Sequence, residues 1–238
     1  MQGGSQGSPR AAPHVLRARA DGHYWPMGSP RVIIADHPVV AHRIATLRSA
    51  RTDAPTFRRV LGETAALVAY EALRDLATAI ELVDTPVAAA APCTVVDETV
   101  LLVPVLRAGL GMVPAIQAIL PRSEVAHVGL RRDEATLEPT VYLDALPKRL
   151  EGRRVVVCDP MLATGGSLAR VCDMLAARGA TDVTALCLLA SGPGLARVHA
   201  RHPALTVACA AIDAELDGSG YIVPGLGDAG DRLFGPPS

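Results

Sequence analysis

The sequence predicts an α/β fold in which helices cover both faces of a central parallel sheet. Half of the 238 residues are hydrophobic and a fifth are charged, which is enough apolar material for a large buried core. From about residue 100 onward, short apolar runs alternate with helical patterns, as in proteins built from strand–helix–strand units. The strand runs are apolar throughout, which is typical of strands buried on both faces.

The N-terminal part of the chain is predicted to be helical. Residues 1–30 are rich in Gly, Ser, Pro and Arg, so we expect a disordered extension before a single domain at 31–238. The ordered chain is expected to begin near Val32, followed by a helix at about 39–50. A cap at Asp53 and an early Pro55 then predict a helix start. Apolar residues recur at helical spacing from 56 to 82, which predicts one long helix and an α-helical region throughout.

The remaining elements alternate. We predict strands at 100–106, 125–130, 155–158, 183–189 and 205–212, and helices at 112–120, 168–178 and 195–202. Pro114 falls in the first turn of the first of these helices, and Gly179 ends the second. Residues 131–152 are polar, contain two prolines and lack a core pattern. They are therefore predicted to form a projecting arm or mobile hairpin.

The composition argues against several functional classes. The formal net charge is −1, the pI is about 6.6 and aromatic residues make up 3% of the chain, so the sequence lacks the basic excess of most nucleic-acid binders. No apolar run reaches about 18 residues, and the start has no apolar stretch of signal-peptide type, so no membrane span or leader is expected. Five cysteines without a CxxC motif favour a reducing, cytoplasmic location.

The segment DPMLATGGS at 159–167 carries the strongest chemical signal. It joins a predicted strand to a predicted helix, so its backbone N–H groups and hydroxyls can hold a phosphate at the helix N-terminus. It lacks the lysine of a P-loop and the GxGxxG of a dinucleotide site. A tight capped turn would be the structural alternative. Asp159 would repel a bare phosphate, but it can accept from ribose hydroxyls or bind Mg²⁺. This combination fits 5-phosphoribosyl 1-diphosphate (PRPP).

Three long segments, in the same order, resemble the uracil phosphoribosyltransferases. DPMLATGGS is similar to their PRPP loop, VPVLRAGLGM at 103–112 to their pyrophosphate loop, and GYIVPGLGDAGDRLFG at 220–235 to their uracil-binding segment. HVGLRRDEATLEP at 127–139 resembles the strand and arm that follow. The resemblance covers residues 36–235. It implies the type I phosphoribosyltransferase fold, with N-terminal helices, a projecting arm and a C-terminal hood that binds the base.

The resemblance also implies roles for individual residues. Arg107 and Arg132 are expected to contact the diphosphate, although Arg131 departs from the family pattern and either of the two adjacent arginines could reach it. Asp228 and Arg107 are expected to be catalytic. The expected PRPP contacts include Asp159, Pro160, Met161, Leu162, Ala163, Thr164, Gly165, Gly166, Ser167 and Asp228. The expected uracil contacts are Ile222, Gly227, Asp228 and Ala229.

The implied activity is the conversion of uracil and PRPP to UMP and diphosphate in pyrimidine salvage. Mg²⁺ is expected to arrive bound to PRPP, with no metal ligands from the protein alone. Some members of the family are activated by GTP and form dimers or tetramers, so a GTP activator and a homodimer or homotetramer are expected here. No nucleic-acid or membrane partner is expected. Two rivals stay open: an RNA-binding regulator with the same fold, and a phosphoribosyltransferase for another base.

Overall fold

The central sheet is mostly parallel, as predicted. The computed structural model describes all residues except 1–16, 19–23, 26–30, 97, 133–138 and 237–238. The main path through the sheet runs β3 (Arg31–Ile34), β14 (Thr206–Cys209), β12 (Asp182–Leu186), β10 (Arg154–Cys158), β6 (Val100–Leu106), β8 (Val128–Arg132) and β9 (Pro139–Asp144). The short β7 (Glu124–Val125) also pairs with β6. Only β9 runs antiparallel to its neighbour in this sheet, because it folds back along β8.

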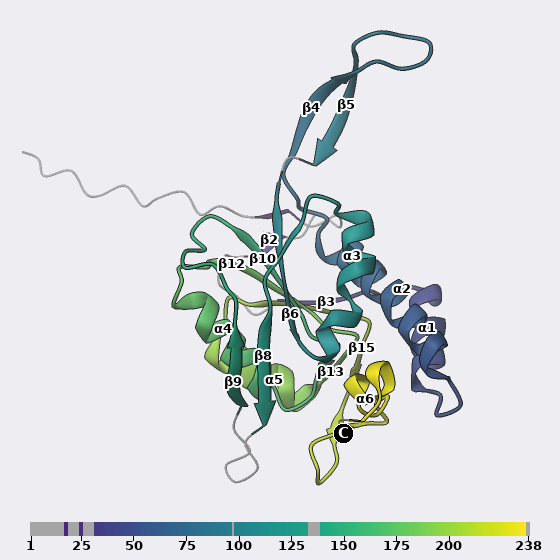
Figure 1. Cartoon of the computed structure of the whole chain (residues 1–238), viewed down its shortest axis with the longest axis vertical. Coiled ribbons are helices and arrows are strands. Elements are labelled where there is room, and N and C mark those ends of the chain that lie inside the picture. The colour runs from purple at the N-terminus through teal and green to yellow at the C-terminus, as the bar shows by residue number, and fades with distance from the viewer. Residues whose placement is uncertain (1–16, 19–23, 26–30, 97, 133–138, 237–238) are drawn as a thin grey trace, which may run out of the picture.

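Helices cover both faces of this sheet (Figure 1). One face carries α1 (Pro38–Arg48), α2 (Ala54–Ala72), the 3₁₀ turn Ala108–Gly111 and α3 (Val113–Ile119). The other carries α4 (Gly166–Ala176) and α5 (Gly192–Arg201). Alternate residues of β10 enter different cores: Val156 packs with Phe57 and Leu61, whereas Val157 packs with Leu175 and Val198. A strand buried on both faces explains why its sequence is continuously apolar.

Side-chain caps fix where the first two helices begin. His37 Nδ1 accepts from the backbone N–H of Val39 at 3.1 Å, and an Asp53 carboxylate oxygen accepts from that of Thr56 at 2.9 Å. Each cap satisfies one of the N–H groups that a helix start leaves unpaired. The predicted start of the second helix after Asp53 is confirmed.

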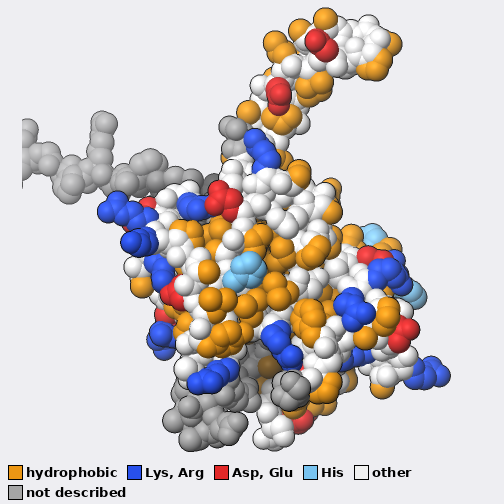
Figure 2. Space-filling model, viewed as in Figure 1, with side chains coloured by type: hydrophobic (Ala, Val, Ile, Leu, Met, Phe, Trp, Pro, Cys, Tyr) orange, Lys and Arg blue, Asp and Glu red, His pale blue; other side chains and the backbone are white. Residues whose placement is uncertain are grey.

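The predicted long helix at 56–82 is wrong beyond residue 72. Helix α2 ends at Ala72, and residues 78–96 form an antiparallel hairpin of β4 (Thr78–Val83) and β5 (Ala91–Val96). The helix prediction extended this far because Leu73, Leu76 and Ile80 continue the three- and four-residue spacing of α2, and no Gly or Pro separates them from it. The hairpin projects from the body of the molecule, and its surface includes many hydrophobic side chains (Figures 1 and 2).

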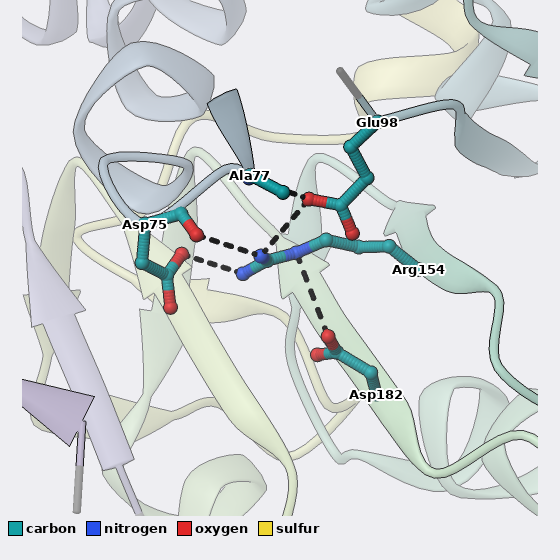
Figure 3. Close-up of polar contacts among 5 residues, drawn as sticks. All are labelled: Asp75, Ala77, Glu98, Arg154 and Asp182. Carbon is teal, nitrogen blue, oxygen red and sulfur yellow. Dashed lines mark hydrogen bonds and ion pairs between the residues drawn. The ribbon is translucent and has the colours of Figure 1, made fainter. Parts of the chain in front are cut away.

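A buried arginine joins both ends of this hairpin to the sheet. Arg154, at the start of β10 and 4% exposed, lies 2.6 Å from a carboxylate oxygen of Asp75, which precedes β4. It also lies 3.7 Å from Glu98, which follows β5, and 3.9 Å from Asp182 (Figure 3). Glu98 in turn accepts from the N–H of Ala77 at 3.1 Å. One cation therefore holds the two ends of the hairpin together.

Two further predictions concern segments that the structure describes only in part. Within the expected disordered extension, Arg17–Ala18 (β1) pairs antiparallel with Tyr24–Trp25 (β2), and the rest of residues 1–30 lies outside the described residues. The boundary at residue 31 stays a prediction. The expected arm begins as the hairpin of β8 and β9, while residues 133–138 lie outside the described part of the chain.

Small sheets and a last helix complete the fold beyond the carboxyl ends of the main strands. The strands predicted at 183–189 and 205–212 each divide in two, and their second parts are β13 (Leu189–Ser191) and β15 (Ala211–Asp213). Strand β13 pairs in parallel with β15 on one side and with β11 (Met161–Leu162) on the other. Then β16 (Glu215–Leu216) pairs with β17 (Ile222–Val223), and α6 (Ala229–Phe234) follows. These last elements form the hood, residues 215–234, beside the carboxyl ends of the main strands.

Candidate active site

Two adjoining cavities lie where β6 and β10 end. The first, of about 300 Å³, is lined mainly by the segment after β10 and the turn after β6. The second, of about 400 Å³, is lined mainly by the hood. Six residues line both: Ala108, Asp159, Met161, Ala163, Asp228 and Gly230. A ligand in one cavity therefore borders a ligand in the other. Clefts at the carboxyl ends of strands are the usual ligand sites of α/β sheets.

The first cavity contains the N-terminus of α4. Residues 161–167 line it continuously, and Gly165 is the N-cap of α4, with no side chain to occupy the free N–H groups there. These N–H groups and the positive end of the helix dipole face an incoming anion. Gly165 has a φ of +79°, and a Cβ at this position would lie 2.8 Å from the carbonyl oxygen of Gly194. The turn therefore requires glycine at position 165 for its own conformation.

Residues 161–167 pack against the start of α5. The Ser191 hydroxyl donates to the carbonyl oxygen of Ala163 at 2.6 Å and accepts from the N–H of Gly194 at 2.8 Å. A Cβ on Gly194 would lie 2.2 Å from that same carbonyl oxygen, so the backbones of the two segments touch. Since Ser191 is fully buried, the support is part of the core.

Asp159 lies at the junction of the two cavities. Among the described residues, the only hydrogen bond that its carboxylate accepts is from the backbone N–H of Met161, at 3.5 Å. Burial raises the pKa of this carboxyl to about 7, and the N–H of Met161 opposes the rise only partly. A carboxylate in such surroundings gains from a ligand that donates hydroxyl groups or brings a cation.

Arg107 directly follows β6 and lines the first cavity. Its Nη2 lies 3.0 Å from a carboxylate oxygen of Asp231 in α6, and the two side chains are 44% and 41% exposed. The following turn is held close to β10, because a Cβ on Gly109 would lie 2.2 Å from the carbonyl oxygen of Cys158. This packing fixes the backbone position from which the side chain of Arg107 extends.

The hood lines the second cavity with backbone and small side chains. The four residues that the resemblance assigns to uracil, Ile222, Gly227, Asp228 and Ala229, all line this cavity. Asp228 also lines the first cavity, and one of its carboxylate oxygens caps α6 by accepting from the N–H of Asp231 at 2.9 Å. Such a surface can offer planar hydrogen-bonding groups to a small heterocycle.

The structure places most of the predicted site residues together. Arg107, Asp159, Asp228 and residues 161–167 line the first cavity. Pro160 is buried and lines neither cavity, and its carbonyl oxygen accepts instead from the N–H groups of Leu188 and Leu189. The side chain of Arg132 lies outside the described residues, and Arg131 is exposed.

Other lining residues were not predicted individually. They are Val105, Leu106, Ala108, Leu130, Leu168, Ser219, Gly220, Tyr221 and Gly230, which flank the predicted positions in the first or second cavity. All but Leu168 and Ser219 fall inside the segments quoted above, so the same motifs could have identified them.

Comparison with known proteins agrees with this geometry. Residues 33–236 match the family model described as uracil phosphoribosyltransferase. The chain is 52% identical over 208 residues to a uracil phosphoribosyltransferase of Kineococcus radiotolerans, a match that covers 86% of this chain and 99% of that protein. It is 48% identical to the one from Streptomyces griseus, with 86% and 98% covered. A solved structure from Aquifex aeolicus superposes with a TM-score of 0.81 at 33% identity, over 86% of this chain and 98% of that one. The chain belongs to the uracil phosphoribosyltransferase family.

Proposed function

We propose that the two adjoining cavities hold PRPP and uracil side by side during the reaction of this enzyme. The chain is a pentosyltransferase of the uracil phosphoribosyltransferase type, which converts uracil and PRPP to UMP and diphosphate in pyrimidine salvage. The observation that carries the assignment of the cavities is their shared wall. Asp159, Asp228 and Ala108 border both, so the C1 atom of a ribose in the first cavity can meet a base in the second.

The 5-phosphate of PRPP is assigned to residues 163–167. The free N–H groups at the start of α4 and the hydroxyls of Thr164 and Ser167 supply the donors that a phosphate needs. The ribose hydroxyls are assigned to Asp159. Its pKa, raised by burial to about 7, supports this role, because donors from the sugar would stabilise the carboxylate form.

The diphosphate is assigned to Arg107 and Arg132. The guanidinium of Arg107 has the planar fork that suits two phosphate oxygens. Mg²⁺ belongs to the substrate in this proposal and arrives bound to the diphosphate. Two carboxylates, Asp159 and Asp228, line the first cavity and make it suitable for a substrate that carries a cation. When bound, the ion neutralises charge on the departing diphosphate.

Uracil is assigned to Ile222, Gly227, Asp228 and Ala229. The base has two carbonyls and two N–H groups in one plane, and backbone groups of a glycine-rich hood can pair with them. The buried Ile222, 5% exposed, supplies an apolar surface for the ring. Asp228 borders both ligands, which supports its assignment, with Arg107, to the catalytic step.

In the reaction, N1 of uracil bonds to C1 of the ribose while the C1–O bond to the diphosphate breaks with its electron pair. Uracil also loses its N1 proton, giving UMP and diphosphate. Positive charge develops on the sugar, and negative charge develops on the departing oxygen near Arg107. The protein contributes mainly positioning and charge stabilisation. The hairpin of β8 and β9, which borders the first cavity at Leu130, is proposed to exclude water, because water could also attack C1.

A homodimer or homotetramer is proposed as the working assembly. The projecting hairpin of β4 and β5 supports self-association, since Ile80, Leu82 and Val87 are 68%, 66% and 95% exposed. Apolar side chains gathered on one surface are typical of contact sites. A measured mass equal to one chain would contradict this proposal.

Activation by GTP is proposed separately. A cavity of about 490 Å³ between α4 and α5 is lined by Arg170, Arg197 and Arg201 with Asp173, and it shares only Gly166 with the first substrate cavity. Its arginines support a separate site for a polyphosphate. Initial rates with and without GTP test it. A rate that ignores GTP would remove this proposal and leave the activity untouched.

The location is proposed to be cytoplasmic. All five cysteines are free thiols, and four of them are buried. This pattern is typical of a reducing compartment. In the part of the chain that the structure describes, no helix is both long and apolar enough to cross a membrane.

One experiment tests the activity and its base specificity together. Purified protein is supplied with PRPP, Mg²⁺ and one free base at a time: uracil, cytosine, hypoxanthine or adenine. UMP formation is expected to exceed every other product. Faster use of another base would overturn the assignment of the hood. Salt-dependent RNA binding in the absence of any turnover would instead favour the regulator.

A further inference from the structure

One residue outside the predicted site contacts both of the residues assigned to catalysis. The carboxylate of Asp231 pairs with the guanidinium of Arg107 at 3.0 Å. Its backbone N–H donates to the Asp228 carboxylate at 2.9 Å. The diphosphate arginine and the base-binding hood are therefore connected through a single residue of α6.

Helix α6 gives Asp231 a fixed position. The next residue, Arg232, stacks on the ring of Phe57 at 4.1 Å and donates to the carbonyl oxygens of Leu226 and Ser49 at 2.9 and 2.8 Å. From α2, Arg58 donates to the carbonyl oxygen of Leu233 at 2.8 Å. These contacts tie the two residues that follow Asp231 to the N-terminal helices, so the backbone that carries the Asp231 side chain is anchored to the body of the protein.

The ion pair leaves most of the arginine fork available. Only Nη2 of Arg107 contacts Asp231, through one carboxylate oxygen, so Nε and Nη1 are not used by this pair. Gly230 leaves room for the approach: a Cβ there would lie 3.2 Å from the Asp228 carboxylate and 3.8 Å from Nη2 of Arg107. The arginine is thus oriented from one side while it lines the first cavity.

We infer that Asp231 is a positioning residue that holds the Arg107 guanidinium ready for the diphosphate of PRPP. The inference rests on the proposed function, which places the diphosphate at Arg107. A long side chain that is 44% exposed samples several rotamers, and ordering it on binding weakens affinity. An aspartate fixed on α6 removes part of that cost before PRPP arrives.

The pair does little for the stability of the fold. Both side chains are more than two-fifths exposed, and ion pairs of this kind contribute little to folding free energy. Loss of the carboxylate charge should therefore show in PRPP binding rather than in unfolding. This separates a positioning role from a structural one.

The test compares Asp231→Asn with the wild-type enzyme. The amide keeps the size of the side chain, and the backbone N–H still donates to the Asp228 carboxylate, but the charge that holds Arg107 is lost. We expect the KM for PRPP to rise about two- to tenfold, the range for ordering one long side chain. The KM for uracil should stay the same, and Tm should move by less than about 3 °C. Asp231→Glu keeps the charge and should recover part of the PRPP affinity.

Two controls make the result specific. Glu71→Gln removes a comparable exposed partner of Arg74 and changes the net charge equally, so it should leave both KM values unchanged. A double-mutant cycle then measures PRPP Kd by calorimetry for Arg107→Gln, with and without Asp231→Asn. If Asp231 acts through Arg107, the second change should alter Kd by less than about twofold.

The inference would be overturned if Asp231→Asn changed the Kd for PRPP by the same factor in the wild-type and Arg107→Gln proteins. It would also be overturned if the KM for PRPP were unchanged in the single variant Asp231→Asn. Neither result would touch the proposed function, which fails only if the wild-type enzyme does not form UMP from uracil and PRPP.

Discussion

The guanidinium of Arg48 and the carboxylate of Asp213 form a bidentate ion pair. The two nitrogens Nη1 and Nη2 donate to the two oxygens at 2.8 and 2.7 Å. The hood is tied to this pair by Gly225, whose carbonyl oxygen accepts from Arg48 at 2.8 Å and whose N–H donates to Asp213 at 3.0 Å. One ion pair therefore connects α1, β15 and the hood.

Replacing Asp213 should loosen the hood. The side chain is only 7% exposed, and Asp213→Asn removes the charge that pairs with Arg48. Hydrogen bonds to charged groups contribute about 1.5–3 kcal/mol, so we expect a lower free energy of unfolding in urea by roughly that amount. The KM for uracil should rise more than the KM for PRPP, because Gly225 lies in the hood. Glu71→Gln, which removes an exposed carboxylate partner, is the control.

The same pair predicts an acid-sensitive part of the stability. The hydrogen bonds from Arg48, followed by that from Gly225, lower the pKa of Asp213 against the opposing effect of burial. A group with a depressed folded pKa stabilises the fold above its unfolded pKa of about 3.9, and this contribution is lost as the pH falls through the lower folded value. The Tm difference between wild type and Asp213→Asn should therefore be largest above about pH 5 and should shrink below pH 4. A difference that stays constant would contradict this.

The contacts between Ser191 and the segment that we assign to the 5-phosphate, residues 163–167, give a third prediction. Ser191→Ala leaves the carbonyl oxygen of Ala163 and the N–H of Gly194 without their buried partner. Each such loss costs about 1–3 kcal/mol, so Tm should fall. The KM for PRPP should rise because residues 163–167 become less ordered. Ser49→Ala, which removes an exposed turn contact to Arg51, should change neither quantity.

Local patterns in the sequence were enough to predict the sheet and the start of α4. Strands β6 and β10 are buried on both faces, so their apolar runs left little ambiguity. The segment at 161–167 could be predicted from the chain order alone, since a strand, a glycine-rich turn and a helix are consecutive. Its conformation could not: the resemblance gave Gly165 only as a PRPP contact, whereas its φ of +79° and its contact with Gly194 show that the fold itself requires glycine.

The sequence could not predict contacts between distant segments. Arg107 and Asp231 are 124 positions apart, and no local periodicity connects them. The helix prediction failed at residues 78–96 for another reason. Its apolar residues continue the spacing of α2, and they are exposed rather than buried, so a rule that assumes apolar residues face a core misreads them.

The cluster around Arg154 predicts a change in stability without a change in chemistry. Arg154→Met leaves Asp75, Glu98 and Asp182 close together without their common cation. Breaking a buried pair costs about 3–5 kcal/mol, and we expect the lower end because the three carboxylates are 23–32% exposed. Urea unfolding should show the loss, while kcat/KM of the folded enzyme should persist, since the cluster is far from both cavities. Arg153→Met, which loses only an exposed pair with Glu124, is the matched control.

The last prediction concerns Asp159, whose pKa burial raises to about 7. An acid with a raised folded pKa favours the fold in its neutral form, so its ionisation costs stability as the pH rises from the unfolded value of about 3.9 to above 7. Without ligand, the nearly isosteric Asp159→Asn should therefore be more stable than wild type at pH 8, and the difference should shrink towards pH 5.

The kcat/KM for PRPP should change in the opposite direction, with Asp159→Asn worse than wild type at pH 8. Only the carboxylate can accept strongly from the ribose hydroxyls, so the variant should lose about ten- to hundredfold in kcat/KM for PRPP at pH 8. Phosphate monoesters such as the 5-phosphate of PRPP have a second pKa of about 6, which is why the ratio of wild-type to variant kcat/KM is the quantity to measure. That ratio should rise between pH 6 and pH 8. A flat ratio near one, with the variant folded, would mean that Asp159 supports the turn and does not hold the sugar.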